Sequence, residues 1–294
     1  EDQRRAARLY RRRRLTALGV LIGTLLVFVL AARAIVGGED EVAAGPSWDL
    51  AMPQAPVWLE QDAAIGRAVK RLDVLRIAGD RRKEIALTFD DGPSPYTPKV
   101  LAALRRYGAH GTFFQVGTMI DEAPEQTRAM TAMPGVELGN HTLGHPRLDL
   151  AERDQQEAQI AGGTEALKGA GAQDVRLFRP PYGATNSQTL AITDRFGLLP
   201  VNWSIDSRDY AKPGVAAIVD GVVSQARPGS IVLLHDGGGD RTQTVQALPR
   251  ILSRLKRQGY RFVTVSELLV GNPPPTEGNT RTAGPAYTAT DSGR

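Results

Sequence analysis

Two adjacent carboxylates, Asp90 and Asp91, are the first residues of this 294-residue chain whose types could do chemistry together. They follow an apolar run, and the pair Gly92-Pro93 then turns the chain. Because adjacent side chains diverge, one carboxylate could bind a metal while the other accepts a proton from water. A turn with two solvated acids would have the same sequence, since Asp and Gly dominate turns. The other motifs must therefore decide between these readings.

A pair of histidines is the second candidate. His141 and His145 are four residues apart, a spacing that brings both imidazoles to one face of a helical turn. Two histidines and one carboxylate, with open coordination positions, form a catalytic ligand set for zinc or another divalent first-row metal. The chain has no cysteine, which excludes thiolate ligands, disulfides and a cysteine nucleophile. A His pair at this spacing can also be incidental.

The elements that would position these residues read as an α/β fold. Short β-rich runs are expected to form strands at 85–89, 111–116, 136–139, 175–178, 199–205, 231–234 and 262–265. Helical patterns occupy 61–77, 98–107, 125–133, 151–168, 187–196, 215–226 and 244–258. Regular alternation predicts a parallel sheet with helices outside it. Seven strands would make a barrel one short of eight, or an open doubly wound sheet.

Most of the ionisable candidates follow strands. They are Asp90 and Asp91 after the first strand, His141 after the third, Arg179 after the fourth, Asp206 and Asp209 after the fifth, and His235 and Asp236 after the sixth. Active sites of parallel α/β folds lie at the carboxyl ends of the strands, so these side chains are expected to meet there. His110 precedes its strand and is expected to be structural or exposed.

Three further segments could complete a site. Pro180 and Pro181 stiffen a turn that could hold Arg179 and the Tyr182 amide in place, although a plain surface loop would look alike. The run 202–210 adds aromatic residues and two acids, and His235 ends an apolar strand with a side chain that titrates near neutrality. No Gly-x-Ser-x-Gly elbow, dinucleotide-binding fingerprint or P-loop is present, and the triple glycine at 237–239 leads to no P-loop lysine.

Five motifs in order resemble the polysaccharide deacetylases of carbohydrate esterase family four, the NodB homology domain. They are Thr-Phe-Asp-Asp-Gly-Pro (88–93), His-Thr-Leu-Gly-His (141–145), Arg-Pro-Pro-Tyr-Gly (179–183), Asp-Ser-Arg-Asp-Tyr (206–210) and Leu-Leu-His (233–235). The resemblance covers residues 83–269. It implies an α/β fold, a distorted (β/α) barrel with about seven parallel strands, and metal-dependent hydrolysis of N-acetyl groups.

The resemblance also implies roles for individual residues. The metal ligands would be Asp91, His141 and His145, and the cation would be Zn²⁺ first, with Co²⁺, Ni²⁺ or Mn²⁺ as alternatives. The catalytic residues would be Asp90 as general base, Arg179 orienting it, His235 as general acid, Asp209 tuning that histidine, and the Tyr182 amide binding the oxyanion. The substrate would contact Pro181, Tyr182, Trp203 and Tyr210. Tyr210 stands where the family often has tryptophan, which affects the shape of the acetyl pocket.

The amino-terminal segment indicates a membrane location. Seven arginines precede an uncharged apolar run from residue 15 to residue 32, which is long enough to cross a bilayer with the arginines inside the cell. We expect a cytoplasmic segment 1–14, a transmembrane signal anchor 15–36, a linker 37–60, the catalytic domain 61–271 and a disordered tail 272–294. The alternative is a secreted protein cleaved near Ala34, because Ala32-Arg33-Ala34 resembles a signal-peptidase site.

The charge distribution does not indicate a basic nucleic-acid surface, and no nucleic-acid partner is expected. Eight arginines against Glu1 and Asp2 place +6 in residues 1–36, so the rest of the chain, whose total is +4, carries only −2. The expected partners are the membrane and an N-acetylated cell-wall polysaccharide, with peptidoglycan N-acetylglucosamine ranked first because an anchor keeps the enzyme beside the wall. The sequence does not predict an oligomeric state.

Other readings remain open at this point. Chitin oligosaccharides, another N-acetylated exopolysaccharide or O-acetylated xylan would suit the same resemblance. A hydrolase of small amides with the same fold would keep the ligand set but close the pocket. A non-catalytic carbohydrate-binding protein would be expected to lack a ligand, acid or base, and a purely structural domain would leave these residues unexplained.

Overall fold

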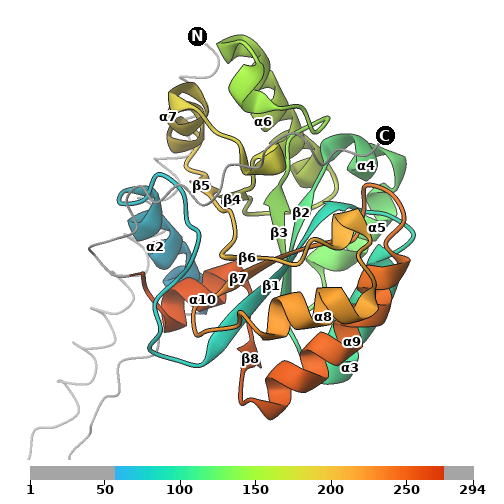
Figure 1. Cartoon of the computed structure of the whole chain (residues 1–294). Coiled ribbons are helices and arrows are strands. Elements are labelled where there is room, and N and C mark those ends of the chain that lie inside the picture. The colour runs from blue at the N-terminus through green and yellow to red at the C-terminus, as the bar shows by residue number, and fades with distance from the viewer. Residues whose placement is uncertain (1–56, 275–294) are drawn as a thin grey trace, which may run out of the picture. The chain divides into compact units, whose positions relative to one another are not determined.

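The protein is described by a computed structural model that defines residues 57–274 (Figure 1). Its centre is a parallel sheet of β1 (Glu84–Gly92), β2 (Gly111–Gln115), β3 (Val136–Asn140), β4 (Leu177–Phe178), β5 (Leu199–Pro200), β6 (Ile205–Asp206), β7 (Ile231–His235) and β8 (Arg261–Phe262). The helices are α2 (Val57–Val69), α3 (Thr97–Tyr107), α4 (Gly117–Glu122), α5 (Pro124–Thr131), α6 (Arg153–Gly169), α7 (Ser187–Arg195), α8 (Val215–Val223), α9 (Thr242–Arg257) and α10 (Val265–Gly271). Short 3₁₀ turns lie at Leu148–Leu150, Pro181–Gly183 and Asp209–Ala211.

The strand order shows that the sheet curves into a distorted barrel. The hydrogen-bonded order is β5-β4-β3-β2-β1-β7-β6, and β8 pairs with β1 beside this path. β5 and β6 are thus the two ends of the path, yet only residues 201–204 separate them in the chain. Five residue steps from Pro200 to Ile205 span no more than about 18 Å, so the two edges must approach each other. The predicted α/β barrel is confirmed.

The central strand β1 divides its side chains between two environments. Ile85, Leu87 and Phe89 are fully buried and face the outer helices. The alternate residues Thr88 and Asp90 face the inside of the curved sheet, because successive side chains of a strand point to opposite faces. Alternation along β1 therefore places a carboxylate inside the barrel.

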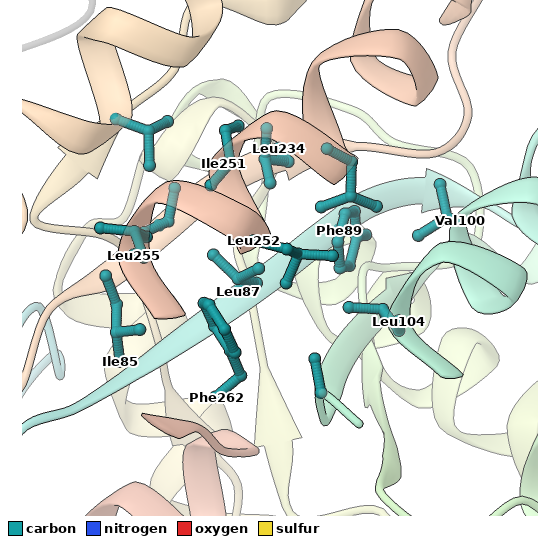
Figure 2. Close-up of a cluster of buried hydrophobic side chains, with 14 of the residues drawn as sticks. Ile85, Leu87, Phe89, Val100, Leu104, Leu234, Ile251, Leu252, Leu255 and Phe262 are labelled. Atoms are coloured by element: carbon teal, nitrogen blue, oxygen red, sulfur yellow. The ribbon is translucent and has the colours of Figure 1, made fainter. Parts of the chain in front are cut away.

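The outer face of β1 carries the main hydrophobic core (Figure 2). Side chains from α3 and α9 pack over the strand there; the labelled examples are Val100, Leu104, Ile251, Leu252 and Leu255. α9 can do this because its apolar residues recur at helical spacing and form one buried stripe. This packing holds β1 in place, and Asp90 and Asp91 lie at the carboxyl end of that strand.

Two of the predicted strands, 199–205 and 262–265, differ from the structure. The run 199–205, predicted as one strand, forms β5 and β6 with an irregular segment between them. The carbonyls of Val201 and Asn202 accept hydrogen bonds from the buried Arg179 guanidinium at 2.9 and 3.1 Å, so this main chain leaves the ladder. The predicted strand 262–265 was wrong at its end, because α10 begins at Val265.

The predicted helix 61–77 begins earlier and ends earlier than expected. α2 ends at Val69, and Leu75 and Ile77 instead make isolated bridges to Val201 and Ser230. Within residues 57–274 no helix has the length and apolar character needed to cross a bilayer. Several predicted segments lie outside the described residues. They are the segments 1–14 and 15–36, the part of the linker 37–60 up to residue 56, and the part of the tail beyond residue 274.

Candidate active site

Asp90 and Asp91 diverge at the end of β1 because the strand is irregular there. The register between β1 and β2 shifts between Asp90 and Gly92, and Asp91 has a left-handed backbone with φ of 71°. A bulge of this kind re-aims a side chain. Asp90 keeps the inward direction of the strand, while Asp91 turns toward the loop after β3.

Asp91 meets two histidines. The Asp91 Oδ1 lies 3.5 Å from His141 Nε2 and 3.2 Å from His145 Nε2. One donor atom from each of the three residues lies within 4.8 Å of the others. The Asp91 Oδ1 is buried without a hydrogen-bond partner among the described residues. A buried carboxylate oxygen that lacks a hydrogen bond, facing two imidazole nitrogens, fits a divalent first-row cation.

Electrostatics also suit a cation. Burial alone would raise the pKa of Asp91, but His141, His235 and His145 outweigh it and hold the pKa far below its ordinary value. Burial and the neighbouring His141 lower the pKa of His145 to about 4. Both groups are therefore in their metal-binding protonation states at neutral pH.

The two histidines converge through a loop, so the predicted helical turn was wrong. Thr142 and His145 have left-handed backbones, with φ of 70° and 60°. The Thr142 amide donates to Asn140 Oδ1 at 2.7 Å, and the His145 amide donates to Thr142 Oγ1 at 2.9 Å. His141 is oriented by a 2.7 Å contact between its Nδ1 and the Arg179 carbonyl, which leaves Nε2 for the metal site.

Asp90 is held by Arg179. The Arg179 guanidinium is fully buried, and its Nη1 donates to Asp90 Oδ1 at 2.7 Å and to Thr88 Oγ1 at 2.7 Å. It also lies 4.1 Å above the centre of the Phe114 ring. The other oxygen of Asp90 lies 3.7 Å from His141 Nε2, so it borders the metal site.

His235 and Asp209 form the opposite side of the site. The His235 Nδ1 lies 2.7 Å from Asp209 Oδ1. Burial alone would lower the pKa of His235, but the charge of Asp209 and this hydrogen bond raise it to about 9. At neutral pH this histidine is therefore a protonated acid.

One cavity of about 150 Å³ joins these groups. Its lining residues are Asp90, Asp91, His141, His145, Tyr182, Trp203, Asp206, Tyr210, Leu233, His235 and Arg241. Its size suits a small group such as an acetamide, because a cavity of about this volume can hold a benzene molecule. The predicted residue Pro181 is buried in the 3₁₀ turn and is not one of the lining residues.

Three aromatic rings border the candidate ligand set and His235. The Tyr182 ring is 4.9 Å from the His145 ring and is 43% exposed, so it forms part of the open rim. The Tyr210 ring meets the His235 ring edge-on at 5.5 Å. Trp203 lies on the same cavity, with Arg179 5.7 Å from its ring centre.

The structure gives Asp206, which was expected at this end of the sheet, a specific contact, and it adds Thr244 and Arg241, which the sequence did not mark. Asp206 lines the cavity and accepts a hydrogen bond from the Tyr210 hydroxyl at 3.1 Å. Thr244 donates to Asp209 Oδ2 at 2.7 Å, and Arg241 lines the cavity. Thr244 and Arg241 lie around the start of α9, and no motif marked them. The fourth histidine, His110, lies away from the site, with its Nδ1 2.7 Å from Glu267, as expected for a structural residue.

Comparisons with known proteins agree with this geometry. The family model described as polysaccharide deacetylase matches residues 78–201. A peptidoglycan-N-acetylglucosamine deacetylase of Bacillus cereus is 46% identical over 193 residues, which cover 65% of this chain and 90% of the relative. A chitooligosaccharide deacetylase of Sinorhizobium fredii is 39% identical over 207 residues, which cover 65% of this chain and 96% of the relative.

A solved structure shows the same likeness. The crystal structure of a peptidoglycan N-acetylglucosamine deacetylase in complex with 4-naphthalen-1-yl-N-oxidanyl-benzamide matches with a TM-score of 0.65 and 31% identity. The match covers 68% of this chain and 94% of that one. With sequence, fold and site in agreement, this chain belongs to the polysaccharide deacetylase family.

Proposed function

We propose that this chain hydrolyses the N-acetyl group of N-acetylglucosamine units in peptidoglycan. The observation that carries the proposal is a single cavity bordered by Asp90, by the ligand set of Asp91, His141 and His145, and by the protonated His235. A non-catalytic binding protein would have no use for a base, a ligand set and an acid in one place.

Asp91, His141 and His145 would hold a divalent cation, and we propose Zn²⁺, with Co²⁺, Ni²⁺ or Mn²⁺ as substitutes. Such a cation supplies Lewis-acid polarisation of the acetamide carbonyl and lowers the pKa of the attacking water. The two imidazoles and one carboxylate leave coordination positions open, as catalytic metal sites require.

Asp90 would act as the general base. Its Oδ1 is engaged by Arg179, so Oδ2 is the oxygen that accepts the proton of the attacking water. Arg179 is itself fixed by Thr88 and by two main-chain carbonyls. The base is therefore oriented before the substrate arrives.

His235 would act as the general acid. Water adds to the carbonyl carbon, and the Tyr182 amide N–H donates to the oxygen of the tetrahedral intermediate. The C–N bond then breaks as His235 donates its proton to the departing sugar nitrogen. Acetate and a free amine are the products, and the acetic acid formed first loses its proton to solvent. The proton that Asp90 took from water passes to His235 through solvent, so both residues return to their starting protonation states.

The substrate proposal rests on similarity and on the expected location. The 46% identical relative is a peptidoglycan deacetylase. The predicted anchor 15–36 would place the catalytic domain outside the cytoplasm, beside the cell wall. The 39% identical chitooligosaccharide deacetylase makes chitin oligomers the second candidate.

Acetate release by the 294-residue chain tests both substrates. N-acetylated peptidoglycan and chitin oligomers would be incubated in parallel with zinc-loaded protein, with EDTA-treated protein as control. We expect zinc-dependent release from peptidoglycan. Release from chitin oligomers alone would support the deacetylase reaction but make chitin oligomers the substrate. No release from either substrate by zinc-loaded protein would refute the proposal.

A further inference from the structure

The triple glycine after His235 packs against the metal ligand Asp91. A Cβ atom on Gly237 would lie 2.0 Å from the Asp91 carbonyl oxygen, and one on Gly238 would lie 2.3 Å from Asp91 Oδ2. Real Cβ atoms do not approach this closely, and Gly238 also has a left-handed backbone with φ of 69°. These positions require glycine because the main chain contacts Asp91 directly.

Arg241 binds the same two glycines. Its Nε donates to the Gly237 carbonyl at 2.6 Å, and its Nη2 donates to the Gly238 carbonyl at 2.8 Å. The residue is only 5% exposed and borders the catalytic cavity. A planar guanidinium that makes two bonds at once fixes the relative position of both carbonyls.

The rest of Arg241 is attached to a rigid support. Its carbonyl accepts the Val245 amide of α9 at 3.0 Å. α9 is anchored in the main core by fully buried residues, including Leu248 and Ile251. The two glycines are thus tied to a helix that the core holds in place.

Asp91 needs support on this side. Its Oδ1 faces the two histidines and has no hydrogen-bond partner among the described residues, while Oδ2 lies against Gly238. The left-handed backbone of Asp91 also has to be held by its surroundings. Mutation of a group that orients a metal ligand typically lowers metal affinity or activity about tenfold to a hundredfold.

We propose that Arg241 is a positioning residue for the metal site: it clamps Gly237 and Gly238, and the clamped main chain holds the Asp91 carboxylate toward His141 and His145. The inference rests on the proposed metal site but not on the identity of the substrate. It gives the triple glycine a role that its sequence alone did not indicate.

Zinc affinity of the whole chain tests the clamp. Arg241→Met keeps an unbranched side chain and removes the guanidinium that binds both carbonyls. Arg250→Met, at an exposed position of α9, is the matched control. Zinc dissociation constants would be measured by competition with a chromophoric chelator, and folding by circular dichroism of the metal-free proteins. We expect Arg241→Met to weaken zinc binding about tenfold to a hundredfold and Arg250→Met to leave it unchanged.

A folded Arg241→Met protein with wild-type zinc affinity would overturn the inference. If Arg241→Met does not fold, Arg241→Lys decides, because it keeps the charge but lacks the two-pronged donor: weaker zinc binding supports the clamp and wild-type binding refutes it. The visible spectrum of the Co²⁺-loaded variant should also change, since the ligand geometry changes, which a loss of stability alone would not cause. A wild-type chain that binds neither zinc nor cobalt would instead refute the metal site, and the clamp with it.

Discussion

The Asp209 carboxylate accepts hydrogen bonds from both the side chain and the main chain of His235. The imidazole Nδ1 lies 2.7 Å from Oδ1, and the His235 amide donates to Oδ2 at 2.9 Å. Thr244 adds a third bond to Oδ2. The carboxylate therefore fixes the ring and leaves Nε2 as the nitrogen that can deliver a proton to the substrate.

Asp209→Asn should shift the alkaline limb of the pH–rate profile to lower pH. Asp209 contributes most to raising the pKa of His235 from 6.5 to about 9, ahead of Asp91 and Asp90, and a general acid works only while protonated, so losing the Asp209 charge ends activity at a lower pH. We expect kcat to fall about 100-fold at neutral pH, the lower bound for a positioned acid. Initial rates of acetate release between pH 6 and 10 measure both; an unmoved alkaline limb would contradict the assignment.

The same pair makes stability depend on pH. Because the folded-state pKa of His235 is raised, its contribution to the free energy of unfolding is complete below pH 6.5 and is lost as pH rises toward 9. Urea unfolding of the metal-free protein should show this loss in the wild type. Asp209→Asn should reduce it, and an identical pH dependence in both proteins would rule the coupling out.

Asp90→Asn should lower kcat by orders of magnitude while zinc binding is retained. The substitution keeps an oxygen for Arg179 but removes the group that accepts the proton, which we expect to cost about 10²- to 10⁴-fold in kcat. Asp91→Asn is the informative comparison, because it should lose zinc as well as activity. Zinc content and acetate release are measured on the same samples; near-wild-type rates for Asp90→Asn would refute its role as base.

The sequence predicted the β-α alternation and the end of the sheet at which the site lies, since both follow from local pattern and parallel topology. It did not predict how His141 and His145 converge. Their spacing suited a helix, but Thr142 and His145 are left-handed, and non-glycine residues adopt that conformation when tertiary contacts such as the Asn140 and Thr142 side chains hold them.

Some missed features had a local signal and others had none. Thr264 and Glu267 form a capping box, with the Thr264 amide donating to Glu267 Oε2 at 2.8 Å, and this spacing in the sequence could have marked the start of α10. The break between β5 and β6 had no such mark. It depends on Arg179 binding the carbonyls of Val201 and Asn202, which only the folded barrel brings together.

Removing Arg179 should destabilise the protein far more than removing a surface arginine. Arg179→Leu leaves Asp90 buried without its partner, and breaking such a pair costs about 3–5 kcal/mol. Arg254→Leu removes an ion pair with Asp220 that has the same 2.7 Å separation but is largely exposed, so it should cost no more than about 1 kcal/mol. Urea unfolding measures both changes in the free energy of unfolding. Equal changes would show that burial does not determine the cost of breaking the pair of Arg179 and Asp90.

Tyr210→Phe tests whether the tyrosine that stands in for the family's tryptophan is held by its hydroxyl. The hydroxyl donates to Asp206 Oδ2, and burial raises the pKa of that carboxyl, which places the hydrogen bond in a partly dehydrated wall of the cavity. Losing about 1 kcal/mol of hydrogen bonding should lower kcat/KM for the N-acetyl substrate about fivefold. The substitution should also lower the ratio of kcat/KM for N-acetyl over N-propionyl substrates, because the hydroxyl no longer fixes the ring that lies beside His235.

Tyr96→Phe is the matched control, because it removes an equivalent hydroxyl-to-carboxylate bond, 2.9 Å to Asp240, on the exposed surface. Its kcat/KM and acyl preference should equal those of the wild type. If Tyr210→Phe also left both unchanged, the ring alone would form the wall, and Asp206 would have no part in shaping the acetyl pocket. If instead Tyr210→Phe lowered kcat/KM equally for both acyl groups, the hydroxyl would act on His235 and not on the fit of the acyl group.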